Sequence, residues 1–264
     1  MVHVLDSRIP RVWRTPDSIQ FGVDDPVLVL EGVTHAEERM LVALSGGVTP
    51  EGLQLIASRA GAPDGSADAL LDRVAPALAS PSPVPAPSLV VLDGAGPTAA
   101  ALERMLTEAG VEVRSGLEWS DPAVERADAA VVVASYAVEP HRHVRWLRRD
   151  VAHLPVVFGD TGVTVGPLVL PGRGPCLRCL DLHRTDADAA WPAMATQLHT
   201  RPAHGETAIA AGATAARAAA LLTTYLRAGR AVPGASARLP SGGADWVSRT
   251  WRPHPECGCL GLPP

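Results

Sequence analysis

The chain of 264 residues has no lysine, so all 23 of its Lys and Arg residues are arginine. This absence excludes a lysine that grips phosphate, a lysine Schiff base and a lysine general base. Apolar runs of 18 residues are also missing, and the Ala-rich stretch 209–226 carries Arg217, which predicts a buried helix rather than a membrane span. The first eight residues contain no apolar signal region, so we expect a cytoplasmic protein without a membrane partner.

Composition predicts a folded chain of two parts. The hydrophobic fraction is 47% and the charged fraction 19%, enough to bury a sizeable core. Five prolines lie in residues 75–88, which predicts an extended linker at 81–88 between a head (1–80) and a body (89–264). The net charge is −5, and the acidic excess falls on the head. This charge argues against a nucleic-acid partner.

The four cysteines form two tight pairs, Cys176 with Cys179 and Cys257 with Cys259. Such pairs are typical of a structural Zn²⁺ site with four thiolate ligands, although iron also accepts four thiolates. Two disulfides or four idle thiols are the alternatives, but disulfides need an oxidising compartment. His183 and His254 lie near enough in sequence to replace a ligand or to hydrogen-bond a sulfur.

The head pattern predicts a small winged-helix-like α+β domain. Alternating residues flank Pro16-Asp17 and indicate a hairpin, a third strand follows at 26–31, and helix starts follow Thr34, Thr49 and Ser66. The head is acidic and lacks a basic recognition helix, which favours peptide binding through a partner strand added to the hairpin edge. The candidate peptide-binding residues are Val12, Ile19, Phe21, Val27 and Leu30. The alternative is a head that only packs against other parts.

The body pattern predicts a Rossmann-like α/β domain. Strands are expected at 88–93, 111–114, 129–134 and 154–158, with a hairpin at 161–170. The first strand leads through Gly94, Gly96 and Ala99 into a helix, the G-x-G-x-x-A arrangement that places backbone N–H groups beneath a phosphate. Two features weaken this nucleotide loop: Pro97 has no N–H, and Arg114 stands near the usual place of the acid that binds ribose.

Three motifs of the body resemble those of the ThiF-like superfamily, the adenylyltransferases of the ubiquitin-activating type. They are the segment 172–179 with its Cys-x-x-Cys, the helical segment 206–226, and the terminal His-Pro-Glu-Cys-Gly-Cys at 254–259. The resemblance covers about residues 89–259 and implies structural zinc, ATP at the glycine loop and a homodimer. With the head and the segment 191–198, the chain looks similar to the leader-peptide-binding partner proteins of azole-forming peptide biosynthesis. In those proteins the head captures a leader strand and a separate cyclodehydratase uses ATP.

Departures from the superfamily pattern determine the predicted function. After the strand at 129–134 the chain reads Ser135-Tyr-Ala-Val-Glu139, without the magnesium-binding aspartates of active members, and it has no lysine. Losing two or more such groups leaves adenylation negligible. We therefore predict a non-catalytic ThiF-like pseudoenzyme that binds a peptide or protein client and presents it to a partner enzyme. The alternatives are a divergent ATP-dependent adenylyltransferase, in which Arg142 or Arg145 replaces the lysine, and a structural dimeric partner with no small ligand.

Two charged clusters remain outside these assignments. Residues 141–149 hold four arginines and two histidines, which fit either an anion site or a solvated helix face. Asp181, Asp186 and Asp188 near His183 suggest a second metal or acid–base chemistry, or else isolated charges on an exposed crossing loop.

Overall fold

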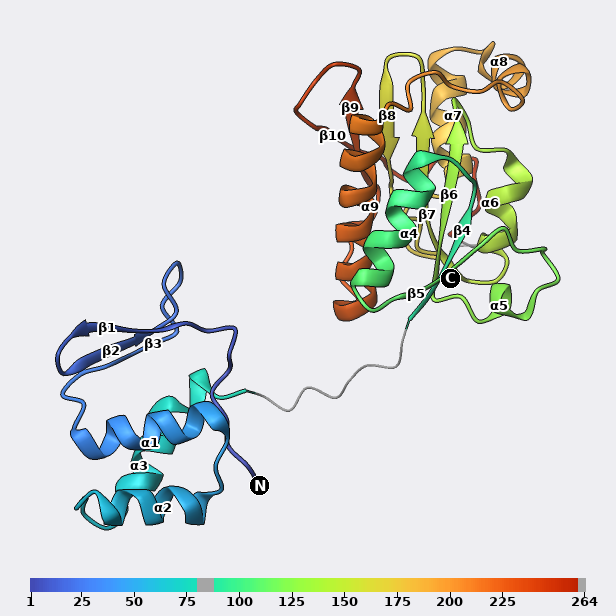
Figure 1. The fold of residues 1–264 in the computed structure, drawn as a ribbon. Helices are drawn as coiled ribbons and strands as arrows, with labels where there is room; N and C mark the ends of the chain where they lie inside the picture. Colours follow the sequence, from blue (N-terminus) through green and yellow to red (C-terminus); the bar gives the residue numbers. More distant parts are fainter. Residues whose placement is uncertain (80–87, 261–264) are drawn as a thin grey trace. The chain divides into compact units, whose positions relative to one another are not determined.

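The computed structural model describes residues 1–79 and 88–260, and the chain divides into two compact units, residues 1–84 and 85–264 (Figure 1). The names head and body are kept for these units. Nearly all of the linker predicted at 81–88 lies outside the described residues.

The head contains a three-stranded antiparallel sheet followed by three α-helices. The strands lie side by side in the order β1-β2-β3, so β1 and β3 are both edges. The elements are β1 Arg11–Thr15, β2 Ser18–Phe21, β3 Leu28–Leu30, α1 His35–Gly46, α2 Pro50–Arg59, α3 Ser66–Val74 and the short 3-10 helix η1 Ala75–Ala77. The predicted hairpin, third strand and three helices are confirmed, whereas the winged-helix-like classification stays a prediction.

Local sequence explains where the first helix of the head begins. The Thr34 side chain accepts a hydrogen bond from the Glu37 N–H, and the Glu37 carboxylate accepts one from the Thr34 N–H, which completes the predicted capping box. Behind this cap, Met40, Leu41 and Leu44 are fully buried in the core of the head. Their spacing of three and four residues places all of them on one face of α1.

The body is built on a seven-stranded mixed sheet in the order β10-β9-β8-β7-β6-β4-β5. Its strands are β4 Leu89–Asp93, β5 Glu112–Ser115, β6 Ala129–Ser135, β7 Ala152–Phe158, β8 Gly162–Val165, β9 Ala235–Pro240 and β10 Val247–Thr250. Its helices are α4 Pro97–Glu108, α5 Pro122–Glu125, α6 Pro140–Leu147, α7 Leu177–Ala187, α8 Trp191–Leu198 and α9 Ala208–Ala228. Strands β5, β4, β6 and β7 are parallel, and the remaining pairs are antiparallel. The predicted Rossmann-like α/β class is confirmed.

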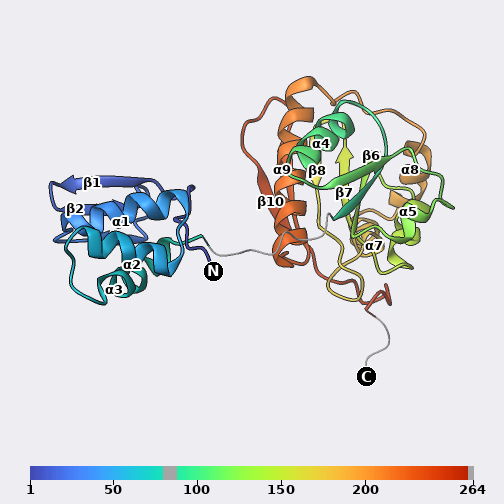
Figure 2. The same ribbon diagram turned by 60° about the horizontal axis from the view of Figure 1, so that its bottom comes forward.

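Two hydrophobic cores lie on opposite faces of this sheet. Val90 and Leu92 of β4 belong to the core with α4 and α9, whereas Val91 belongs to the core with α5, α6 and α7. This alternation follows from the two-residue period of a strand. Helices α4 and α9 lie side by side on one face in both views (Figures 1 and 2). Because β4 lies between β5 and β6, its carboxyl end is the switch point where Rossmann-like sheets bind ligands.

The structure corrects two expectations for the second half of the body. Residues 161–170 are not a hairpin of their own: β8 pairs with the preceding β7 through a turn in which the Gly159 N–H donates to the Gly162 carbonyl. Asp181 and Asp186 do not lie on an exposed crossing loop but on helix α7, where Asp181 bonds Arg184 and the indole of Trp191.

Helix α9 meets the length and hydropathy of a membrane span, with 28% of its most apolar window buried. One side of α9 packs Ala211, Ala215, Ala218 and Leu222 into the core. The buried helix that the sequence predicts is therefore buried on this side only. It begins after Thr207, whose hydroxyl accepts the Ala210 N–H.

Candidate metal centre and nucleotide loop

The fold brings the two cysteine pairs together. Cys176 stands immediately before α7 and Cys179 in its first turn, while Cys257 and Cys259 lie in the turns that follow β10. The sulfur of Cys176 lies 3.4 Å from that of Cys257 and 3.9 Å from that of Cys179, and the sulfurs of Cys179 and Cys259 are 3.4 Å apart. All four sulfurs lie within 4.8 Å of one another.

These distances fit a tetrahedral metal. Four thiolates at about 2.3 Å from a zinc ion stand about 3.8 Å from one another, close to the separations in this cluster. A disulfide requires sulfurs about 2.05 Å apart, and all four cysteines are free thiols. The donor set is thus compatible with a structural zinc site, with Cys176, Cys179, Cys257 and Cys259 as the ligands.

Burial makes a deprotonated thiol costly at this cluster unless a cation is bound. Burial raises the pKa of Cys176 far above its ordinary value and raises the pKa of Cys257 to about 11. Burial acts in the same direction on Cys179, but hydrogen bonds from the backbone at His254 and at Cys176 lower its pKa below the ordinary value. A divalent cation deprotonates coordinating thiols, so it removes the cost of holding charged sulfur in this half-buried place.

The two nearby histidines do not act as sulfur partners through their side chains. The His254 Nε2–H donates to Asp186 over 2.9 Å, and its Nδ1 accepts the Glu256 N–H over 3.1 Å. The Nε2 of His183 lies 2.9 Å from the Arg252 carbonyl, to which it donates. Both imidazoles therefore tie the C-terminal turns to α7. The ligand atoms of His183, Asp186 and His254 also lie within 4.8 Å of one another, so these three residues form a second group that could hold a metal.

The glycine loop has the predicted strand–turn–helix setting at the carboxyl end of β4. Gly94 and Gly96 have φ values of +140° and +112°, which favour glycine. A Cβ at Gly94 would stand 2.8 Å from the Val133 side chain, and one at Gly96 would stand 2.9 Å from a Glu206 carboxylate oxygen. Ala99 is buried in the core. Other residues of the protein therefore pack against Gly94, Gly96 and Ala99 at the position where the sequence predicts a phosphate.

The charged groups of this loop are paired internally. The Thr98 N–H at the start of α4 donates to the Glu206 carboxylate over 2.8 Å. The Arg142 guanidinium donates to both carboxylate oxygens and to the carbonyl of Asp93, and also to the Val133 carbonyl. Arg142 is thus neutralised rather than free to replace a lysine on a triphosphate.

A cavity of about 430 Å³ lies beside the loop, lined by residues that include Trp119, His141, Arg142 and Arg145. The guanidinium groups of Arg145 and Arg149 stack on the Trp119 ring, with 5.1 and 4.2 Å to its centroid. The cluster at 141–149 therefore serves partly in packing. The Glu206 carboxylate already occupies the first amide of α4, and the chain has no lysine. The residues at the carboxyl end of β4 therefore do not fit a nucleoside triphosphate.

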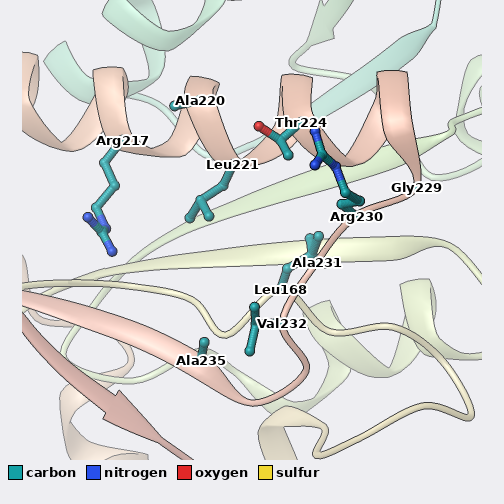
Figure 3. Close-up of a pocket in the computed structure, with 10 residues that line it drawn as sticks. All are labelled: Leu168, Arg217, Ala220, Leu221, Thr224, Gly229, Arg230, Ala231, Val232 and Ala235. Atoms are coloured by element: carbon teal, nitrogen blue, oxygen red, sulfur yellow. The ribbon is translucent and has the colours of Figure 1, made fainter.

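A second cavity, missed by the sequence reasoning, runs along the uncovered side of α9 (Figure 3). Its volume is about 950 Å³, and apolar side chains such as Leu168, Leu221 and Val232 line it together with Arg217 and Arg230. The guanidinium of Arg217 lies 4.8 Å from the centroid of the Trp246 ring. The helical spacing of Arg217, Leu221 and Thr224 was the available signal, because it places these side chains on one face.

The structure corrects part of the peptide-binding set in the head. Ile19, Phe21 and Leu30 are at most 2% exposed, because the pairing of β2 and β3 turns them toward the helices as core residues. Val12 and Val27 are exposed and remain available to a partner. Trp13 on β1 is 49% exposed and was missed, although it stands in the predicted hairpin.

Comparison with known proteins supports the fold. No family model matches the chain, and no curated protein matches it in sequence. Among solved structures, a heterocyclase in complex with substrate and cofactor gives a TM-score of 0.71 at 17% identity over 98% of this chain and 39% of its own. The heterocyclase TruD gives 0.68 at 17% identity over 98% and 43%. The E. coli protein MccB bound to ATP gives 0.55 at 12% identity over 99% and 100%.

The chain spans about two fifths of the length of the two heterocyclases. At these identities the likeness concerns the fold alone. It agrees with the Rossmann-like α/β body that the sequence predicts.

Proposed function

We propose that this chain is a non-catalytic, ThiF-like protein with a structural zinc ion, which binds a peptide client and presents it to a partner enzyme. The observation that carries the non-catalytic part is the internal pairing at the glycine loop, where Glu206 holds the α4 amide and Asp93 neutralises Arg142. Adenylyl transfer depends on placed cations and metal, and the Arg142 guanidinium beside this loop is already paired with a carboxylate.

The free edge of β1 supports a peptide client. All five residues of β1 are exposed, and β1 pairs only with β2 among the described strands. An unpaired strand edge offers its N–H and C=O groups to an added strand, and Trp13 offers an aromatic anchor beside it. Arg11 on the same strand favours a client segment with an acidic residue, whereas Arg14 already pairs with Glu31 over 3.5 Å.

Similar proteins point the same way. The neighbours include a heterocyclase in complex with substrate and cofactor. They also include MccB, a microcin C7 biosynthetic enzyme, in complex with N-formylated MccA. The resemblance to leader-peptide-binding proteins suggests that this chain too handles a precursor peptide, while a separate enzyme performs the chemistry.

Selection from a displayed peptide library on the zinc-replete, full-length protein tests this role. A selected peptide should lose at least about tenfold in affinity with Trp13→Ala, the size of effect of removing an aromatic anchor. Val42→Ala, an exposed apolar change on α1, is the matched control and should bind normally. Loss with Val29→Pro instead of Trp13→Ala would move the site to the β3 edge, and peptide crosslinks confined to residues 88–260 would exclude the head.

A homodimer through the uncovered side of α9 is part of the proposal. The apolar cavity there, with the exposed side chains of Leu221 and Val232, offers a surface for a second copy of the body. Light scattering of Leu221→Asp against wild type tests this, because a buried carboxylate at the interface should yield monomers. A monomeric wild-type protein would exclude it.

A further inference from the structure

The side chain of Glu206, which precedes α9, lies against the start of α4, where the glycine loop ends. We infer that the Glu206 carboxylate takes the place of a nucleotide phosphate on α4 and latches the segment 199–206 onto the carboxyl edge of the sheet. This inference deepens the non-catalytic part of the proposed function and is independent of peptide binding by the head.

The start of α4 offers little besides the bond that Glu206 takes. The first residue of the helix, Pro97, has no N–H, so Thr98 carries the first amide available to an anion. This amide donates to one Glu206 oxygen over 2.8 Å, and the missing side chain of Gly96 leaves room for the other oxygen. The positive end of the helix dipole favours the carboxylate as it would favour a phosphate.

A second polar contact holds the same segment. The Ala203 N–H donates to the Ser135 hydroxyl over 3.0 Å, at the end of β6. Gly205 passes the end of β7 so closely that a Cβ there would stand 3.0 Å from the Gly159 carbonyl. The segment thus contacts the carboxyl ends of β6 and β7 and the loop that follows β4, where the switch point lies.

The negative charge of Glu206 excludes a phosphate from the Thr98 amide. A phosphate on the Thr98 amide would have to displace Glu206 or stand against its negative charge, and like charges at such a distance repel strongly. The cations that line the neighbouring cavity of about 330 Å³ are Arg142 and Arg201, and Arg142 is committed to Asp93. Wild-type protein should therefore bind neither inorganic phosphate nor Mg-ATP.

Residue-resolved amide exchange on the zinc-replete, full-length protein tests the latch. In Glu206→Ala the Thr98 amide and the amides of 199–206 should exchange at least about fivefold faster, the effect of losing a capping carboxylate. Glu206→Gln should fall between Glu206→Ala and wild type, because its amide oxygen still accepts the bond without the charge. Glu118→Ala, an exposed acid of the same body, should leave both regions unchanged.

The outcomes separate the latch from the proposed function. Unchanged exchange at Thr98 in Glu206→Ala and Glu206→Gln would overturn the latch and leave the proposed function standing. Calorimetric binding of Mg-ATP to the wild-type protein would overturn both. Should Glu206→Ala fail to fold, the nearly isosteric Glu206→Gln still gives the measurement, and wild-type rates there would overturn the latch.

Discussion

The cysteine cluster and the glycine loop lie in the same body, and both hold groups that commonly bind ligands. At the cysteine cluster four thiols converge to tetrahedral separations, and no cationic side chain among the described residues neutralises them. At the glycine loop the Thr98 amide and the Arg142 guanidinium already have carboxylate partners within the chain. A ligand motif thus predicts binding only when the protein's own side chains leave its donors free.

Removing one cysteine should give the largest effect, because it breaks the proposed zinc site. In Cys257→Ser we expect loss of stoichiometric zinc and a loss of unfolding free energy of the body on the order of 3–5 kcal/mol, since metal binding contributes directly to folding. Metal analysis and denaturant unfolding measure both quantities. Thr250→Ser, an exposed change just before the same turns, is the control.

Two outcomes would contradict the contrast between the sites. Full stability of the body in Cys257→Ser would show that the cluster is not structural. A loss of stability in the head, followed by amide exchange of its residues, would show that the effect is not confined to the body. Chelation of the wild-type protein should reproduce the variant.

Acid should destabilise the body through two buried histidines that belong to neither site. Burial lowers the pKa of His143 and of His153 to about 4, below the ordinary value of about 6.5. A histidine whose pKa is lowered by folding is neutral in the folded state. Its contribution to stability is therefore complete above about pH 6.5 and is lost as the pH falls toward 4. At pH 5 the loss is on the order of 2 kcal/mol for each histidine.

The variant His143→Phe separates this effect from acid release of zinc. Its unfolding free energy should fall less between pH 7 and pH 5 than that of wild type, while the zinc content of both proteins, measured in the same samples, stays equal. An identical pH dependence in the two proteins would remove His143 from the account.

The sequence predicted correctly the elements whose signals are local, and the four proposed zinc ligands lie close together in the fold. The strand at 129–134 is apolar throughout because both faces of β6 are buried, and the Cys-x-x-Cys spacing places Cys176 and Cys179 in one helical turn. The pairing of Thr98 with Glu206 spans 108 residues and has no local pattern. The sequence predicted the glycine turn correctly but could not show that an internal carboxylate lies beside it.

The same reason explains the errors in the head. The patterns at 18–23 and 26–31 predicted strands, but they do not tell which face the three helices will cover. Ile19, Phe21 and Leu30 turned out to lie on that covered face, whereas Val12 lies on an edge strand that the helices leave exposed. The exposed face of a strand follows from tertiary packing, which the period of the sequence leaves open.

Arg142→Ala tests the glycine-loop side of the comparison with a moderate expected effect. It removes the hydrogen bonds to Asp93 and to the Val133 carbonyl, so we expect a loss of about 1–3 kcal/mol in the unfolding free energy of the body. Zinc content should not change, and no phosphate binding should appear, because the variant removes a cation. Arg148→Ala, an exposed arginine that follows α6, is the control. A gain of phosphate binding would contradict the internal role of Arg142.

Asp186→Ala should have the smallest effect, because it removes only a partner of the cysteine cluster and its side chain is 65% exposed. Asp186 accepts the His254 Nε2–H, and His254 in turn bonds the sulfur of Cys179 through its backbone. Loss of such support lowers metal affinity by about 10-fold or less where the carboxylate is exposed.

Competition with a zinc-binding dye measures this change, and Asp186→Asn identifies its cause. An asparagine keeps an oxygen that accepts the Nε2–H, so it should restore most of the affinity if orientation of His254 is what Asp186 supplies. Equal losses in both variants would mean that the negative charge matters rather than the hydrogen bond. The glycine loop should respond to neither variant, since its donors have their own carboxylates in Glu206 and Asp93.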